Sequence, residues 1–230
     1  MDTTSVLQAN QLTKIYGKGE AAFAALNAID LEIAKGQSVA ILGKSGSGKS
    51  TLMHLLALLD SPTSGSVFVD GVDASKLSTV KLDKLRNQSF GFVFQQFFLN
   101  ANQSVLENVI LPLKIAGVSA GVRKERAMKV LASVELEEKA TSKANDLSGG
   151  QKQRLVIARA LINEPQIIFA DEPTGNLDSA TGALIQDLLL RLNSERGITL
   201  VMVTHDWDLA AKCERFIEIK DGCIIKDDKR

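Results

Sequence analysis

Three short segments of the chain are almost continuously apolar, and each one ends at a polar residue. They are residues 39–42 (VAIL), 167–170 (IIFA) and 199–203 (TLVMV). An uninterrupted apolar run of this length is typical of a strand covered on both faces, as in a parallel sheet packed between helices. Because ligands in such sheets bind beyond the carboxyl ends of the strands, the polar residues that follow these runs are candidates for a functional site.

A different pattern marks the two ends of the chain. Turn formers such as Gly17 and Gly36 divide the first forty residues into short stretches with strand character. Asp-Gly dipeptides stand at residues 70–71, after VFV, and at residues 221–222, between FIEIK and CIIK. This dipeptide tolerates positive φ and favours a tight hairpin. The sequence therefore predicts antiparallel ribbons in addition to the parallel strands.

Strand signals fade between about residues 104 and 160, where a helical pattern replaces them. Ala127, Val130, Leu131 and Val134 recur at the spacing of one helix face, beneath the charged segments RKER and ELEEK. We interpret these charges as a solvated helix surface rather than a binding patch. The segment is expected to be a helical insert.

Composition excludes several classes of partner. The 27 basic residues balance the 27 acidic ones, so no general field would draw the chain onto nucleic acid or an anionic membrane, and we expect no nucleic-acid partner. Cys213 and Cys223 suit a reducing compartment without requiring it. The amino terminus has no basic start before an apolar run, and no eighteen consecutive residues are apolar. We expect a cytoplasmic protein that reaches a membrane only through a partner.

The first apolar run leads into a glycine-rich loop that fits the pattern GxxxxGK[ST] and precedes the apolar segment TLMHLLALL. Glycines let successive N–H groups point into one concavity, and the start of a helix adds partial positive charge. Lys49 can reach the β- and γ-phosphates of a nucleotide, and the Ser50 hydroxyl can bind Mg²⁺. The residues expected to bind the nucleotide here are Gly43, Lys44, Ser45, Gly46, Ser47, Gly48, Lys49, Ser50 and Thr51.

The other two runs supply acidic and basic groups at the same sheet edge. Asp171 would hold Mg²⁺ through its water shell, and Glu172 is placed to accept a proton from an attacking water. Alone, such a carboxylate pair is as often a turn or a helix cap, but beside a phosphate loop the catalytic interpretation is favoured. His205, after the third run, could hydrogen-bond the γ-phosphate or the water. His54 is better explained as a packed or solvent-facing residue.

A second glycine-rich helix start, LSGGQKQR, occupies residues 147–154. Ser148 is a good N-cap and apolar residues follow at helical spacing, so a structural cap explains the local sequence adequately. The phosphate loop already surrounds one flank of the γ-phosphate, however. A second helix start would help most on the opposite, exposed flank.

The chain resembles the nucleotide-binding subunit of an ABC transporter along essentially its whole length. The resemblance rests on four motifs in the order of that family: the phosphate loop, LSGGQ, IIFADE and TH. GFVFQ, LENV and ADEPTGNLDSATG resemble the branch that contains LolD, MacB and FtsE. The resemblance implies an α/β fold of the P-loop NTPase class: a RecA-like core with an antiparallel β subdomain and an inserted α-helical subdomain. We expect a single ABC ATPase domain over residues 1–230. Residues 1–95 and 161–230 would form the core with the β subdomain, and residues 96–160 the helical subdomain with the signature.

The resemblance also implies roles for residues outside the phosphate loop. Tyr16 matches the aromatic residue that stacks on adenine, and Gln95 matches the glutamine that senses Mg²⁺ and the permease. The expected Mg²⁺ ligands are thus Ser50, Gln95 and Asp171, and the expected catalytic residues are Lys49, Glu172 and His205. In this family two chains pair head to tail, and the signature of each closes on the ATP of the other. The signature residues expected to do so are Ser148, Gly149, Gly150 and Gln151. Asp178, with Asn176 and Leu177, matches the loop that communicates between the two ATP sites.

The function that the resemblance implies is hydrolysis of ATP to ADP and phosphate by a homodimer that forms in the ATP-bound state. This dimer would drive a transmembrane permease from the inner face of the cell membrane. A regulatory subunit that signals through a membrane protein without moving cargo is an alternative that the sequence does not separate from transport. A DNA-repair or chromosome-organising ATPase is disfavoured because no sustained heptads separate the phosphate loop from LSGGQ. A P-loop kinase is disfavoured because no acceptor site is evident.

The chain departs from the family pattern mainly where it would meet the permease. Asn100, Ala101 and Asn102 replace a stretch in which relatives often have leucine and proline. Ala144 stands where many members have proline, and Ala57 where many have glycine. None of these positions binds phosphate, so the departures leave the partner and the cargo open.

Overall fold

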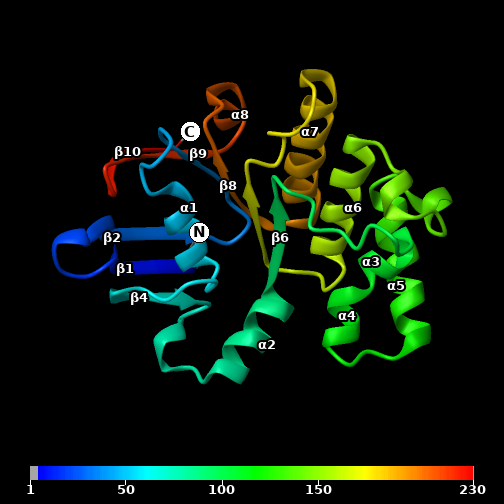
Figure 1. Cartoon of the computed structure of the whole chain (residues 1–230), viewed down its shortest axis with the longest axis horizontal. Helices are drawn as coiled ribbons and strands as arrows, with labels where there is room; N and C mark the ends of the chain where they lie inside the picture. The colour runs from blue at the N-terminus through cyan, green and yellow to red at the C-terminus, as the bar shows by residue number, and fades with distance from the viewer. Residues whose placement is uncertain (1–4, 230) are drawn as a thin grey trace.

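The computed structural model describes residues 5–229, which form two β-sheets with helices packed around them (Figure 1). Residues 1–4 and 230, the outer ends of the predicted segments 1–95 and 161–230, lie outside this range. The strands are β1 (Ser5–Tyr16), β2 (Phe23–Ala34), β3 (Ser38–Leu42), β4 (Ser64–Val69), β5 (Val72–Asp73), β6 (Phe90–Phe94), β7 (Ile167–Asp171), β8 (Thr199–Thr204), β9 (Arg215–Lys220) and β10 (Cys223–Lys229). The helices are α1 (Lys49–Leu56), α2 (Thr79–Ser89), α3 (Val105–Val109), α4 (Leu111–Ile115), α5 (Ala120–Ser133), α6 (Gly149–Leu161), α7 (Ser179–Arg196) and α8 (Trp207–Ala211).

The larger sheet has the strand order β10-β9-β3-β8-β7-β6. The three predicted apolar runs are β3, β7 and β8, and they pair in parallel, with Val39 opposite Val201 and Ile168 opposite Leu200. This confirms the predicted parallel strands. β6 and β9 extend the parallel pairing on the two sides, on β7 and β3 respectively. The sequence pattern assigned β9 only to a hairpin and did not assign β6.

Alternate residues of these strands enter two separate hydrophobic clusters. Val39 and Ile41 pack with α1 and with the inner face of the antiparallel sheet. Ala40 and Leu42 pack on the opposite side, in the cluster that also holds buried residues of α5, α6 and α7. Both faces of the strand are therefore covered, which explains why the sequence shows no polar alternation here.

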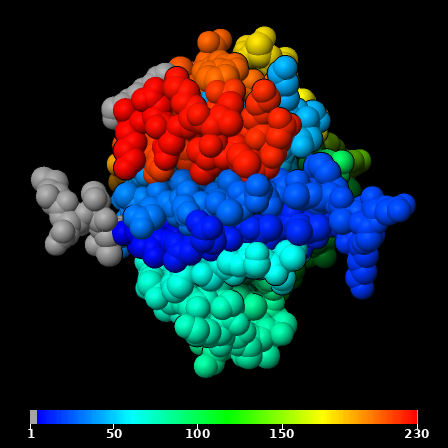
Figure 2. Space-filling view, turned by 90° about the vertical axis from the view of Figure 1, so that its left-hand side faces the viewer, coloured from blue at the N-terminus to red at the C-terminus, as the bar shows by residue number. Residues whose placement is uncertain are grey.

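The smaller sheet is antiparallel, in the order β2-β1-β4-β5, and in Figure 2 β1 and β2 run as a band across one face of the molecule. Asp70 and Gly71 link β4 to β5 with φ of 48° and 75°, and Asp221 and Gly222 link β9 to β10 with φ of 50° and 75°. Two successive residues of positive φ are what a tight hairpin turn of the favoured hand requires. Both predicted hairpins are confirmed.

Helices occupy the segment that was predicted to be a helical insert, and they lie on the right-hand side of Figure 1. Ala127, Val130 and Leu131 are the buried residues of α5, as their spacing predicted. α6 packs on α3 and α5 but also on the parallel sheet, where a Cβ at Gly91 of β6 would lie 2.6 Å from the carbonyl oxygen of Ala160. The division at residues 96–160 stays a prediction, because α6 belongs to both packing units.

Two further observations concern the membrane and the cysteines. Across residues 5–229, no helix has the combination of length and apolarity that crossing a bilayer requires. Cys213 is buried and Cys223 is partly buried, and no disulfide joins them.

Candidate functional site

The phosphate loop connects β3 to α1, and its glycines are required by close backbone contacts. Gly43 has φ of 155°, and a Cβ there would lie 2.3 Å from the carbonyl oxygen of Ile219. Gly48 has φ of 106°, and a Cβ there would lie 2.5 Å from the carbonyl oxygen of Ala25. A side chain at either position would collide with backbone and adopt an unfavourable conformation. The loop is thus wedged between the two sheets.

The turn between β9 and β10 also holds the phosphate loop in place. The Gly222 amide donates to the Ser47 carbonyl oxygen at 3.0 Å, and the Asn27 amide donates to the Gly222 carbonyl oxygen at 2.9 Å. Within the loop, Lys49 Nζ donates to the Lys44 carbonyl oxygen at 2.9 Å. The loop is therefore closed on itself by its lysine and fixed from outside by a distant hairpin.

A cavity of about 740 Å³ opens above this loop and brings together residues from five separate parts of the chain. The predicted site residues that line it are Tyr16, Lys44, Ser45, Gly46, Gly48, Lys49, Ser50, Thr51, Gln95, Glu172 and His205. Gly43 and Ser47 do not line it and shape the loop from behind. Phe23, Ala25 and Gly175 also line the cavity, although sequence reasoning did not select them.

The magnesium prediction rests on Asp171, at the end of β7. The pKa of Asp171 is raised above its ordinary value, mainly because the carboxyl group is partly buried. His54, Lys49 and a hydrogen bond with the Ser50 hydroxyl lower this pKa, and the charge of Glu172 raises it further. Asp171 is partly buried and pairs with Phe94, the residue before Gln95, although unlike Ser50 and Gln95 it does not line the cavity. A carboxylate that hydrogen-bonds a hydroxyl at this strand end, with an amide one residue further along the neighbouring strand, supplies oxygen ligands that suit Mg²⁺. The residues present therefore fit the predicted ion.

Glu172 leaves the strand direction immediately after Asp171. Its φ is 45°, its amide donates to the Val203 carbonyl oxygen at 2.9 Å, and its side chain is 22% exposed. A left-handed conformation at a non-glycine residue is uncommon and often marks a functional site. Glu172 Oε1 lies 2.9 Å from His205 Nδ1, at the mouth of the cavity. The fold thus brings together the predicted base and the predicted histidine.

Gln95 follows β6 and is tied to the loop after β7. Its Nε2 donates to Asn176 Oδ1 at 3.3 Å, and Asn176 Nδ2 donates to the Gln95 carbonyl oxygen at 2.9 Å. A Cβ at Gly175 would lie 2.7 Å from Gln95 Nε2, so a larger residue at position 175 would displace the Gln95 side chain. The loop predicted to sense the permease and the loop predicted to join two ATP sites are therefore in direct contact.

Tyr16 is held by a polar cluster that the sequence analysis missed. Its hydroxyl donates to Asp60 Oδ2 at 2.9 Å, and Lys14 Nζ lies 2.8 Å from Asp60 Oδ1 and 4.9 Å from the centre of the Tyr16 ring. Burial raises the pKa of the Tyr16 phenol above its ordinary value, and the hydrogen bond with Asp60 raises it further. Phe23 lies opposite Tyr16 in the β1–β2 pairing and is 59% exposed. Its place beside Tyr16 depends on hairpin register, which the sequence alone does not fix.

The signature residues lie away from the nucleotide cavity of their own chain. Ser148 and Gln151 form a capping box at the start of α6: the Gln151 amide donates to Ser148 Oγ at 3.3 Å, and the Ser148 amide donates to Gln151 Oε1 at 2.9 Å. Asp178 is the N-cap of α7, and its side chain accepts a hydrogen bond from the Thr181 amide at 3.0 Å. None of these three predicted residues, Ser148, Gln151 and Asp178, lines the cavity above the phosphate loop.

The glycine pair of the signature has a packing role within the chain. A Cβ at Gly150 would lie 2.5 Å from Thr181 Cγ2, and one at Gly149 would lie 3.3 Å from Leu177 Cδ2. The first turns of α6 and α7 therefore approach closely. Sequence reasoning missed this contact, because nothing local identifies Thr181 as the neighbour of Gly150.

Comparisons with known proteins agree with the site geometry. The sequence matches the family described as ABC transporter over residues 26–175. It is 47% identical over 228 residues to the uncharacterized ABC transporter ATP-binding protein MJ0796 of Methanocaldococcus jannaschii, with 97% of each chain covered. It is 44% identical over 219 residues to the lipoprotein-releasing system ATP-binding protein LolD of Xanthomonas axonopodis pv. citri, covering 95% of this chain and 90% of LolD.

A third relative is longer than this chain. The macrolide export ATP-binding/permease protein MacB of Mannheimia succiniciproducens is 46% identical over 226 residues, which cover 98% of this chain and 35% of MacB. The chain thus spans about a third of the length of that relative. Among solved structures, the dimeric post-hydrolysis state of MJ0796 bound to ADP and Pi superimposes with a TM-score of 0.88 at 45% identity, covering 97% of this chain and 98% of that one.

These matches confirm the predicted resemblance and the α/β fold class with its helical insert. They also support the predicted ATPase class, since a cassette of this fold was solved with the products of ATP hydrolysis. The roles of individual residues stay predictions.

Proposed function

The chain belongs to the ABC transporter family, and we propose that it is the ATP-hydrolysing subunit of a transporter in which two copies close around two ATP molecules. The observation that carries this proposal is the cavity in which the phosphate loop, Glu172 and His205 converge. A lysine, a strand-end carboxylate and a histidine at one cavity supply charge neutralisation, a base and a hydrogen-bonding group.

The proposed reaction is the attack of water on the γ-phosphorus of ATP. Glu172 takes a proton from the water as its oxygen bonds to phosphorus and the bond to the bridging oxygen of ADP breaks. His205, 2.9 Å from Glu172, holds the carboxylate in position. Lys49 and the loop amides stabilise the charge on the phosphate oxygens. Ser50, Asp171 and Gln95 would hold Mg²⁺, which adds positive charge at the same oxygens when bound.

The second half of each site is proposed to come from the other copy. Ser148 and the amides of Gly149 and Gly150 stand at the start of a helix, where partial positive charge favours an anion. In this chain they lie outside the nucleotide cavity, as the prediction of closure between copies requires. The dimeric MJ0796 structure supports the same arrangement by analogy.

A concentration series tests this composite site. Phosphate release per chain should rise with protein concentration, because an active site forms only when two chains meet. Full activity that is independent of concentration, in a chain that light scattering shows to be monomeric, would refute the composite site. ATP binding to the monomer serves as the control, since it needs only the phosphate-loop half.

We propose that the permease binds at a groove of about 600 Å³, which is lined by Phe94, the residue before Gln95. Binding to the permease would hold the protein at the inner face of the membrane as a peripheral subunit. Phe98 and Ile115 line the groove and are 65% and 71% exposed, which is unusual for large apolar side chains. Arg159 donates to the carbonyl oxygens of Phe97 and Phe98 at 3.0 and 2.7 Å, so the groove wall is preformed. Asn100 follows this wall and is fixed by the buried Asn108, whose Oδ1 accepts from its amide at 2.8 Å.

The names of the relatives support transport of an export or lipoprotein-extraction type over signalling without cargo. The membrane protein that co-purifies with the chain tests this choice. Reconstitution of the two proteins in vesicles should show ATP-dependent movement or release of a cargo. ATP hydrolysis that alters the partner without moving any cargo would favour the regulatory alternative.

A further inference from the structure

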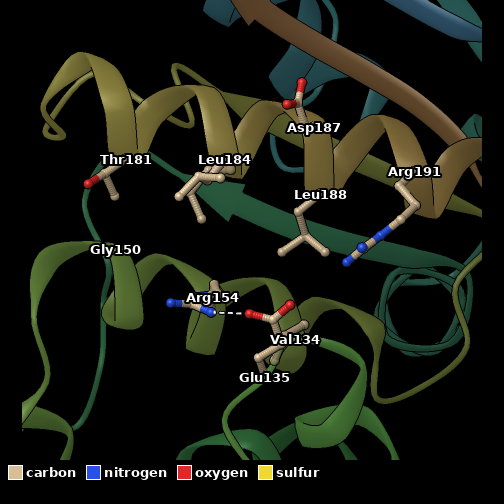
Figure 3. Close-up of a pocket in the computed structure, with 10 residues that line it drawn as sticks. Val134, Glu135, Gly150, Arg154, Thr181, Leu184, Asp187, Leu188 and Arg191 are labelled. Carbon is tan, nitrogen blue, oxygen red and sulfur yellow. Dashed lines mark hydrogen bonds and ion pairs between the residues drawn. The ribbon is translucent and has the colours of Figure 1, made fainter.

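A second cavity, of about 430 Å³, lies between α6 and α7 and shares no lining residue with the nucleotide cavity. Figure 3 shows its two walls: Leu184 and Leu188 point down from α7, and Val134 faces them from the end of α5. Leu184 is 69% exposed, so one wall offers apolar surface to solvent. This volume falls within the range of about 300–1,000 Å³ that small-molecule sites occupy.

Two basic residues, Arg154 and Arg191, and two acidic residues, Glu135 and Asp187, line this cavity. Arg154 is ion-paired with Glu135 at 2.9 Å across the cavity floor. Asp187 points away from the cavity in Figure 3 and is paired with Lys212 at 3.1 Å. Arg191 is exposed and projects its guanidinium into the space between the helices, and within residues 5–229 this guanidinium makes no hydrogen bond or ion pair. One positive charge is therefore left unpaired beside an apolar wall.

We propose that this cavity binds a small amphiphilic anion, with its negative head on Arg191 and its apolar body between Leu184 and Val134. A guanidinium forms paired, charge-assisted hydrogen bonds with a carboxylate, and burial of the apolar body adds hydrophobic stabilisation. A neutral amphiphile would leave Arg191 unpaired, and a cationic one would be repelled by it. The charge of the head group therefore decides binding.

The position of the cavity links such a ligand to the signature. Gly150 and Thr181 line its far end, where the first turns of α6 and α7 meet. A ligand that contacts both helices favours one spacing between them and so shifts the ATP-dependent dimerisation. This effect on dimerisation rests on the function proposed above, whereas binding of the anion does not.

Calorimetric titration of the nucleotide-free protein with decanoate, below its micelle-forming concentration, tests the binding. We expect one saturable site for decanoate and at least about tenfold weaker binding of decanol and decyltrimethylammonium, because only the carboxylate pairs with Arg191. Arg191→Gln should weaken decanoate binding by at least about tenfold. Arg126→Gln, which removes the same charge from an exposed position of α5, should leave it unchanged.

Equal binding of decanoate and decanol, or undiminished decanoate binding to Arg191→Gln, would overturn the proposal. Leu184→Gln, at an exposed position that tolerates polarity, provides a second variant and should also weaken binding. The link to the signature is tested in the Glu172→Gln variant, in which the ATP-bound dimer should accumulate. Decanoate should change the fraction of this variant that is dimeric with ATP, and the change should vanish in the double variant that also carries Arg191→Gln. A dimer fraction that decanoate does not change would overturn the link while leaving the binding result and the ATPase assignment intact.

Discussion

The two glycine-rich helix starts of this chain differ in what satisfies their first amides. Gly48 precedes α1 and offers no side-chain cap, so the start of that helix faces a cavity with its amides available to a ligand. Ser148 precedes α6 and completes a capping box with Gln151. Similar local sequences thus give one helix that is completed by a ligand and one that is complete within its own chain. The first should bind phosphate alone, and the second should act only when another chain brings the anion to it.

The largest effect is expected on the phosphate-loop side. Glu172→Gln should lower the rate of ATP hydrolysis by about a hundredfold or more, because the amide cannot accept the proton of the attacking water. ATP binding should persist, and the ATP-bound dimer should accumulate in size-exclusion chromatography. Glu138→Gln, an exposed change of the same type, is the matched control. Hydrolysis by Glu172→Gln close to the wild-type rate would exclude Glu172 as the base.

A smaller effect is expected from packing on the signature side. Gly150→Ala would place a methyl group 2.5 Å from Thr181 Cγ2, and overpacking of this kind costs about 1–3 kcal/mol of unfolding free energy. Gly149→Ala, with 3.3 Å to its nearest neighbour, is the matched control and should cost less. Urea unfolding measures both. Thr181→Ser removes the opposing methyl group and should restore stability to Gly150→Ala; a double variant that is no more stable would show that the contact is not the cause.

The cap itself separates the two interpretations of Ser148. Ser148→Ala should cost about 1 kcal/mol of stability and weaken ATP-dependent dimerisation, with ATP binding to the monomer unchanged. Ser148→Asp keeps a good N-cap but adds negative charge where a γ-phosphate would sit. It should fold as stably as the wild type and dimerise with ATP less than Ser148→Ala. Wild-type dimerisation by Ser148→Asp would mean that Ser148 is only a cap.

The smallest effect is expected from Asp171 in the absence of nucleotide. Burial raises the pKa of Asp171 in the folded protein above the unfolded value of 3.8, so the carboxyl group ionises less readily in the folded state. The free energy of unfolding therefore falls as the pH rises from the unfolded pKa through the folded pKa. Asp171→Asn cannot ionise and should raise the thermal midpoint of the nucleotide-free protein near neutral pH, with the gain shrinking as pH falls toward 4. Differential scanning fluorimetry over this pH range measures the trend. A gain that does not depend on pH would contradict the assigned cause.

The parallel core was predictable because a strand that is buried on both faces has a nearly continuous apolar sequence. β3, β7 and β8 carry nearly unbroken apolar runs, whereas β6 reads FGFVF, and its glycine at position 91 is there for contact with α6 rather than for strand propensity. β9 was visible as a hairpin arm, but its parallel pairing with β3 joins residues 176 positions apart, such as Val39 and Arg215. Long-range pairing of this kind leaves no local signal.

The candidate site divides in the same way. Asp171, Glu172 and His205 lie within two residues of the end of an apolar run, and Lys49 closes the loop that follows another, so the sequence indicates the edge of the sheet at which they meet. Asp60 and Phe23 reach the cavity region through strand register and a distant turn, and Thr181 reaches Gly150 through helix packing. Their roles depend on neighbours that only the folded chain supplies.

The hydrogen bonds from the β9–β10 turn to the phosphate loop have a practical consequence. Gly222 supports Ser47 and Asn27 from a ribbon that lies at the carboxyl end of the described residues and contributes no lining residue to the cavity. A deletion that begins at Asp221 would remove these hydrogen bonds, and a fusion partner joined rigidly to β10 would strain them. Either change should weaken nucleotide binding. Expression tags intended to leave nucleotide affinity intact should therefore be separated from β10 by a flexible spacer.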